Sequence, residues 1–188
     1  MKTKTKALGL MMAAVLLVTA TIFGTMAYLT STDEVTNTFT VGSVAITMDE
    51  APVGTDGKEI SGDRVKANSY KLMPGHVYDK DPIVHFQPKS EASWLFIEVT
   101  NEIADIESKA NDYKSIATQI TDNGWTALDG VTGVYYKSVP ANTGDAAVDY
   151  PVFQGFTVDG SVTGTTLESY NSKTVKIIAY AVQADGFT

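Results

Sequence analysis

The chain has 188 residues, with 22 acidic residues against 14 basic ones, a formal net charge of −8, and no cysteine. Because phosphate binding needs clustered Lys and Arg, this acidic composition argues against a nucleic-acid partner and against docking on anionic lipid. The absence of cysteine excludes disulfides and thiol catalysis, and it is typical of proteins exported by cells without oxidative folding machinery, such as Gram-positive bacteria.

Residues 1–27 have the pattern of a secretory signal peptide. Three lysines occur in the first six residues, an apolar charge-free run follows, and the run ends in the small residues Gly24-Thr25-Met26-Ala27. A basic start, an apolar middle and a small-residue exit are the three parts of such a signal. We predict cleavage between Ala27 and Tyr28. The alternative is an uncleaved membrane anchor, since a span needs about 20 apolar residues.

The remaining chain, residues 28–188, is predicted to form a single domain. Its first strand pattern runs from Phe39 to Met48, but the apolar residues change parity at Gly42-Ser43. A shift of one residue turns side chains to the opposite face of a sheet. The glycine therefore predicts a bulge or a crossing between sheets.

Further strands and turns follow in the first half of the domain. Residues 51–62 are rich in turn formers and predict a hairpin loop, and Met73-Pro74-Gly75 predicts a turn. We expect a short strand over residues 83–86, and the strongest core strand over Trp94 to Val99. In the latter, Leu95, Ile97 and Val99 share one face.

The second half continues in strands, with one stretch of helical appearance. Residues 103–120 have apolar residues at helical spacing, and residues 167–170 predict a single helical turn. Residues 125–128 and 134–137 predict a hairpin around Asp129-Gly130. Strands are also expected over 152–158 and 173–182, the latter with Val175, Ile177, Ala179 and Ala181 facing the core. About eight short strands predict an all-β fold, a jelly-roll-like antiparallel β-sandwich with little helix.

Sequence motifs for catalysis are lacking. The two histidines, His76 and His85, do not have the spacing of a zinc protease, and there is no G-x-S-x-G elbow, P-loop or dinucleotide fingerprint. Asp79 and Asp81 flank a lysine and predict a turn rather than a calcium site. We therefore predict no enzyme: no catalytic residues, no cofactor-binding residues and no metal ligands.

The segment Tyr28 to Ile46 is more informative. With the preceding Gly24-Thr25-Met26-Ala27 exit, its Asn37, Phe39, Gly42 and Ile46 resemble the start of the TasA/camelysin family. Residues 72–75 with 81–82, and the tail 179–187, are also similar to segments of that family. The resemblance implies a leader cut by a signal peptidase of the SipW type, so that the chain contacts the membrane only before cleavage and is then secreted to the matrix or cell surface of a Gram-positive bacterium.

The resemblance also implies a function. Members of the family are jelly-roll subunits of extracellular biofilm-matrix fibres that join by donor-strand exchange, with copies of themselves or with related matrix subunits. Residues 28–41 would be the donor strand, and adding a strand to an exposed sheet edge gains main-chain hydrogen bonds. Its residues at odd positions share one face; the assembly strand comprises Leu29, Val35, Asn37, Phe39 and Val41.

Three alternatives stay open at this point. The same strand could fold into its own domain instead of a neighbour. The chain could be a camelysin-like cell-surface metallopeptidase, although it departs from any standard zinc motif. It could also be a monomeric cell-surface binding module for wall polymer or sugar, using exposed aromatics from the set Trp94, Trp125, Tyr135 and Tyr136.

Overall fold

The structure is a computed structural model that describes residues 2–29, 42–108 and 113–186. The chain divides into two units, Met1–Thr40 and Val41–Thr188, which are described separately. Four of the five predicted assembly-strand residues, Val35, Asn37, Phe39 and Val41, lie outside the described residues.

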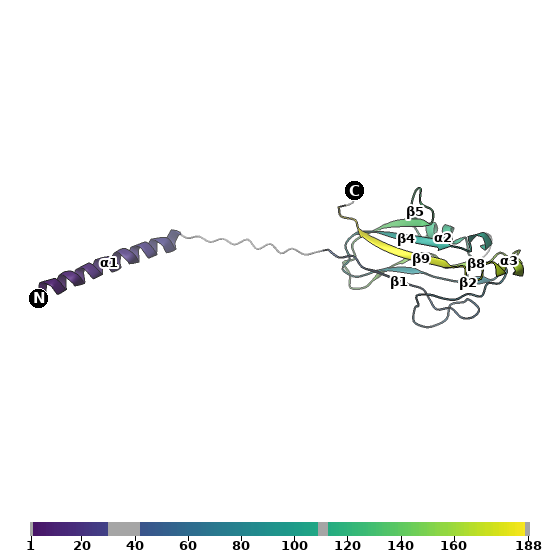
Figure 1. The fold of residues 1–188 in the computed structure, drawn as a ribbon, viewed down its shortest axis with the longest axis horizontal. Helices are drawn as coiled ribbons and strands as arrows, with labels where there is room; N and C mark the ends of the chain where they lie inside the picture. The colour runs from purple at the N-terminus through teal and green to yellow at the C-terminus, as the bar shows by residue number, and fades with distance from the viewer. Residues whose placement is uncertain (1, 30–41, 109–112, 187–188) are drawn as a thin grey trace. The chain divides into compact units, whose positions relative to one another are not determined.

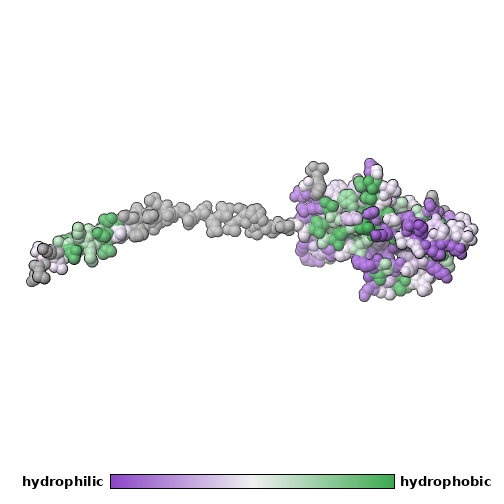
Figure 2. All heavy atoms as spheres, viewed as in Figure 1, coloured by the Kyte–Doolittle hydropathy of each residue, from purple (hydrophilic) through white to green (hydrophobic). Residues whose placement is uncertain are grey.

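The first unit contains a single described element, the helix α1 (Lys2–Leu29). The described side chains of its middle part are mostly apolar and exposed, as Figure 2 shows. Thr19 keeps this surface apolar because its hydroxyl donates to the Val15 carbonyl at 2.7 Å. The predicted cleavage junction, Ala27–Tyr28, falls at the end of α1. Among the described residues, no helix meets the length and apolarity that a membrane span requires.

The second unit is rich in β-structure, and its strands pair antiparallel (Figure 1). Its largest sheet has four strands in the order β5 (Thr126–Ala127), β6 (Val134–Val139), β4 (Ser93–Asn101) and β9 (Val175–Gln183). The predicted core strand and closing strand are thus confirmed, and they pair with each other along their whole length. The hairpin around Asp129-Gly130 is confirmed by the pairing of β5 with β6.

Two smaller sheets complete the unit. One has the order β1 (Ile46–Asp49), β3 (Ile83–Phe86) and β7 (Val148–Pro151). The other pairs β2 (Val77–Asp79) with β8 (Gly155–Thr157). The strand predicted over 83–86 is confirmed. The strand predicted over 152–158 is shorter than expected, and β2 and β7 were not predicted.

Helices are short in this unit: the 3-10 helix η1 (Ala104–Ile106), α2 (Ile116–Asp122) and α3 (Gly164–Glu168). The prediction of one helix over 103–120 is therefore wrong in its first part. The Ser115 side chain accepts from the Thr118 N–H and caps α2 at its start. The buried Glu107 carboxylate accepts from the Ile116 N–H at 3.1 Å, which fixes the beginning of α2. The predicted helical turn near 167–170 is present as α3, three residues earlier.

One hydrophobic core joins the inward faces of the sheets. Val84 and Phe86 of β3 and Leu95 and Ile97 of β4 are fully buried. Trp125 closes the core beside α2, where its indole N–H donates to the Pro151 carbonyl at 2.9 Å. The other fully buried side chains that close this region come from α2 and from the irregular segment before β8: Ile116, Ile120, Val152 and Phe153.

The predicted turns form as expected. At Met73-Pro74-Gly75 the His76 N–H donates to the Met73 carbonyl at 3.2 Å, and Gly75 has a φ of +70°, which glycine adopts readily. Residues 51–62 form a hairpin loop in which Val53 pairs with Glu59. Before β1, the Ala45 carbonyl accepts from the Gln87 N–H and the Ser43 carbonyl from the Glu91 N–H, so the pairing is irregular there. The strand expected from Phe39 to Met48 is described only from Ile46, and the bulge or crossing at Gly42-Ser43 stays a prediction, since residues 39–41 lie outside the described residues.

Candidate functional site: an open groove between two sheet edges

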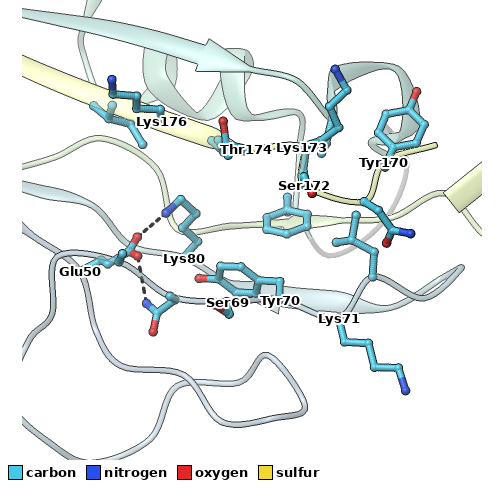
Figure 3. A pocket seen from close by; sticks show the side chains of 18 of the residues that line it. Glu50, Ser69, Tyr70, Lys71, Lys80, Tyr170, Ser172, Lys173, Thr174 and Lys176 are labelled. Carbon is cyan, nitrogen blue, oxygen red and sulfur yellow. Dashed lines mark hydrogen bonds and ion pairs between the residues drawn. The ribbon is translucent and has the colours of Figure 1, made fainter. Parts of the chain in front are cut away.

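A pocket of about 1020 Å³ lies between β1 and β9. One of its walls is formed by residues 66–72 and the end of β1, and the other by residues 170–177, which lead into β9 (Figure 3). Figure 1 shows β9 between β4 and β1 in the fold. The pocket therefore follows the line where the edges of two sheets approach each other. We call it the β1–β9 groove.

Both strands that border the groove are sheet edges. β9 pairs with β4 on one side, and within the described residues its backbone has no hydrogen-bond partner on the other side. The free edge of β1 is different, because Lys66 Nζ donates to the Met48 carbonyl and Arg64 Nη2 donates to the Asp49 carbonyl at 3.3 Å. Side chains thus protect the β1 edge, and β9 offers a row of unused main-chain donors and acceptors.

The inward side chains of β9 and of the segment around β1 are only half-buried, and Met48, Val175 and Ile177 of this set line the groove. Val175, Ile177, Ala179 and Ala181 of β9 pack against the core, but each keeps part of its surface exposed. Val44, Ile46 and Met48, in and before β1, are in the same situation. By contrast, the neighbouring inward residues of β4, such as Leu95, are fully buried. Apolar surface is therefore left uncovered along this side of the domain.

Aromatic rings form the base of the groove. The Tyr70 ring meets the Tyr78 ring edge-on at 5.9 Å and the Phe156 ring at 5.6 Å between centroids. Its hydroxyl donates to the Asp79 carbonyl at 2.9 Å. Burial raises the pKa of Tyr70 above its ordinary value, so this phenol stays neutral. The base of the groove is therefore aromatic, and its Tyr70 hydroxyl is hydrogen-bonded and uncharged.

Lysines surround the groove, although the chain as a whole is acidic. Figure 3 shows Lys71 and Lys173 on opposite walls, with their amino groups directed away from the cavity. Lys173 pairs with Glu102 at 3.1 Å, whereas Lys71 and Lys176 have no ion-pair partner among the described residues. The five lysines that line the groove are Lys66, Lys71, Lys80, Lys173 and Lys176.

A buried ionic cluster lies at one end of the groove. Lys80 Nζ contacts Glu50 Oε2, and the Asn68 amide donates to Glu50 Oε1 at 3.0 Å, as the dashed lines in Figure 3 mark. Lys80 and Glu50 are only 8% and 4% exposed. Each charge is therefore compensated in the interior by the other.

A second charged cluster connects β1 to its sheet. His85 on β3 lies between two carboxylates, with Nε2 at 2.9 Å from Asp49 and Nδ1 at 2.6 Å from Asp149. Arg64 also bonds to Asp49, and its Nη1 donates to Asp81 at 2.9 Å. Burial alone would lower the pKa of His85, but the hydrogen bonds and charges of the two aspartates raise it. His85 thus links β1, β3 and β7, and the two aspartates favour its protonated form.

The structure places the remaining sequence candidates apart from one another. His76 Nε2 lies 2.8 Å from the Asp56 carbonyl, whereas His85 belongs to the three-stranded sheet. Asp79 accepts from the Glu59 N–H and Asp81 from the Ala51 N–H, so the two carboxylates have different structural partners. The described part of the chain contains no group of three His, Asp or Glu residues that could hold a metal ion.

One of the aromatic residues proposed for ligand binding, Trp125, was predicted to be exposed, and this prediction is wrong. It is 2% exposed and belongs to the core, because α2 and Pro151 cover it. Trp94 and Tyr136 lie on the outer face of the four-stranded sheet, with ring centroids 5.8 Å apart. Phe96 extends this aromatic pair, and Tyr180 and Val182 of β9 lie opposite Phe96 and Trp94 and are exposed.

Sequence reasoning missed the β1–β9 groove, because its walls come from segments far apart in the chain. The only local sign was the alternation of half-buried apolar residues on β9, which does not reveal whether a strand is central or at an edge. Searches among protein families, curated proteins and solved structures found no match for this chain.

Proposed function

We propose that the chain is a secreted structural protein, a subunit of extracellular biofilm-matrix fibres that assemble by donor-strand exchange. Its second unit would be a jelly-roll-like β-sandwich that lacks one strand. The observation that carries the proposal is the β1–β9 groove, where the unpaired edge of β9 lies beside half-buried apolar side chains. An added strand would satisfy the edge and cover the apolar surface at the same time.

Residues 28–41 of a neighbouring copy are the proposed occupant. They offer Leu29, Val35, Phe39 and Val41 at positions of one parity, and one face of a strand consists of such positions. The segment is longer than β9, which has nine residues. It therefore has enough length to pair with the whole edge.

The charges of the two partners are complementary. Residues 28–41 contain Asp33 and Glu34 and no basic residue, and the groove lining has five lysines against three acids, Asp49, Glu50 and Glu168. Opposite charges steer association and penalise wrong partners. The charges therefore favour binding of residues 28–41 in the groove over binding of more basic segments of the chain.

In this proposal, cleavage at Ala27–Tyr28 precedes assembly. Before the cut by a SipW-type signal peptidase, the N-terminus of the donor segment is attached to the leader. After the cut, residues 28–41 are free to reach a neighbour. Export to the matrix or surface of a Gram-positive bacterium and assembly would then be consecutive steps.

Electron microscopy of the secreted, processed protein tests the proposal. We expect fibres from the chain that starts at Tyr28 and none from a chain that starts at Phe39. Ile177→Ser, which places a polar group inside the groove, should abolish or strongly reduce fibres. Ile178→Ser is the matched control, because Ile178 lies on the opposite face of β9, across from Glu98. Fibres from the chain starting at Phe39 would refute donor-strand exchange.

A second candidate function has one supporting observation, the aromatic surface of Trp94, Phe96 and Tyr136 on the outer face of the sheet. Aromatic rings stack on the apolar faces of sugars, so this surface suits a monomeric module that binds wall polymer. A processed protein that stays monomeric in sedimentation and binds wall fragments, with binding lost in Trp94→Ala, would favour this function over the fibre subunit.

A further inference from the structure

Three side chains from separate segments meet at the end of the groove. Glu50 follows β1, Asn68 lies in the wall of residues 66–72, and Lys80 follows β2. One carboxylate contacts both of the others, through Oε2 to the Lys80 amine and through Oε1 to the Asn68 amide at 3.0 Å. A nucleophile and an amide carbon thus lie on either side of one buried carboxylate, with Lys80 buried and Asn68 partly buried.

We propose that Lys80 and Asn68 become joined by an intramolecular isopeptide bond, with Glu50 carrying the proton. The Lys80 ammonium gives a proton to the Glu50 carboxylate, and the neutral Nζ attacks Asn68 Cγ. The new Nζ–Cγ bond forms, the proton held by Glu50 passes to Nδ2, and the Cγ–Nδ2 bond breaks. Nζ then gives its second proton to Glu50, so that the product is a neutral amide beside a protonated Glu50. One molecule of ammonia is released, and no oxidant, reductant or cofactor is consumed.

The Asn68 amide is held in a defined orientation for this attack. Its Nδ2 donates to the Ala51 carbonyl at 2.8 Å as well as to Glu50, and its Oδ1 accepts from the Val53 N–H at 3.1 Å. A backbone N–H on the amide oxygen stabilises the negative charge that develops there when the carbon becomes tetrahedral. Fixing both reactants beside one carboxylate supplies the proximity that converts a slow reaction into an efficient one.

The surroundings shield the Lys80–Glu50 pair from solvent. Lys80 and Glu50 are almost completely buried, Ala51 is 5% exposed, and the Lys80 amine lies 6.0 Å from the centre of the Tyr70 ring. With so little water around them, the Lys80 amine and the Glu50 carboxylate have each other as their nearest charged partner. Lys58 offers a comparison, because its pair with Asp79 is 44% and 26% exposed and no Asn or Gln side chain is seen to bond to that carboxylate in the described residues.

The bond would close a ring that includes the Pro-Gly turn and β2, and it would fix the wall of the groove to the strand beneath it. The inference does not depend on fibre formation, because all three residues belong to one chain. It can therefore be tested whether or not the protein assembles.

Peptide mapping of the purified full-length protein is the decisive experiment. If the residues are not joined, complete tryptic digestion gives 67–71, 72–80 and 81–89 as separate peptides. If they are joined, the acylated Lys80 resists trypsin, and peptide 67–71 appears attached to 72–89 with a mass lower by one ammonia than the two linear peptides together. Separate peptides with unmodified Lys80 and Asn68 would overturn the proposal.

Three variants define the roles. Glu50→Gln should keep the chain unjoined, because the amide cannot accept the proton, and Lys80→Arg should do the same, because the nucleophile is lost. Lys58→Arg is the matched control and should give the branched peptide in full. A branched peptide in Glu50→Gln would refute the role of Glu50. If that variant does not fold, the map of the unaltered protein still decides whether the bond exists.

Discussion

Two sides of the same β-rich unit differ in how completely their apolar residues are covered. On the side of α2, residues such as Ile120 and Phe153 are fully buried. Along the β1–β9 groove, residues with the same inward orientation, such as Ile177 and Met48, stay partly exposed. The difference in burial comes from what covers the residues, because α2 and an irregular segment cover the first side and no described element covers the groove. An apolar face without a cover is where a partner is to be expected.

The largest effect is expected on the closed side. Trp125→Ala should lower the free energy of unfolding by about 3–5 kcal/mol, because it removes a buried ring and leaves a cavity. The same kind of truncation on the open side, Ile177→Ala, should cost clearly less in the isolated subunit, since part of that side chain is already hydrated. Urea unfolding followed by circular dichroism compares the two. Equal losses would contradict the distinction between the two sides.

A ligand that covers the apolar residues of the open side should increase the free energy of unfolding. A synthetic peptide of residues 28–41, added to the chain that starts at Phe39 at about 100 times its dissociation constant, should stabilise that chain by about 2.7 kcal/mol. The measurement is the shift of the unfolding midpoint. A peptide of the same composition in scrambled order is the control, and equal shifts from both peptides would show that the groove does not select this segment.

The charged cluster on β1 predicts a pH-dependent contribution to stability. The pKa of His85 is raised in the folded state by Asp49 and Asp149, so its contribution is fully present below the unfolded-state pKa of about 6.5. It is lost as the pH rises through the higher folded-state pKa. The free energy of unfolding of the unaltered protein should therefore fall between mildly acidic and mildly alkaline pH. In His85→Gln this fall should be absent. Unfolding curves at several pH values measure this, and unchanged pH dependence in the variant would contradict it.

The smallest effect is expected at an exposed ion pair beside α2. Lys114 and Asp122 lie 2.6 Å apart, but their side chains are 65% and 51% exposed. Removing the pair by Lys114→Ala should change the free energy of unfolding by less than about 1 kcal/mol, because water and salt screen such contacts. Asp122→Ala should give a similar value. A loss comparable to that of Trp125→Ala would show that exposure is a poor guide to stability in this protein.

The long strands were predictable from the sequence, and the short ones were not. β4 and β9 carry several apolar residues in alternation, which is a strong signal, and β3 is bounded by prolines. β2 has three residues, and β7 ends in Pro151 and is largely exposed, so neither carries enough pattern to be recognised. The helical stretch expected over 103–120 was too long because the backbone is extended at Glu107, whose carboxylate instead accepts from the Ile116 N–H at the start of α2.

The groove and its clusters could not be derived from the sequence for a related reason. Glu50 and Lys80 are thirty positions apart, and their contact depends on how β1 and β2 are brought together. The β9 edge depends on strand order, which alternation does not specify. The sequence analysis considered His85 only as a metal ligand, because the two aspartates beside it come from strands on either side of it in the sheet.

The positions of the two tryptophans have a practical consequence for spectroscopy. Trp125 is enclosed in the core beneath α2, with Lys137 Nζ 5.8 Å from its ring centre, whereas Trp94 lies on the outer face of the sheet opposite Val182 of β9. The fluorescence of Trp125 therefore reports global unfolding, and that of Trp94 reports events at the β9 edge. With Trp125→Phe and Trp94→Phe variants, the two signals can be recorded separately, without any attached dye.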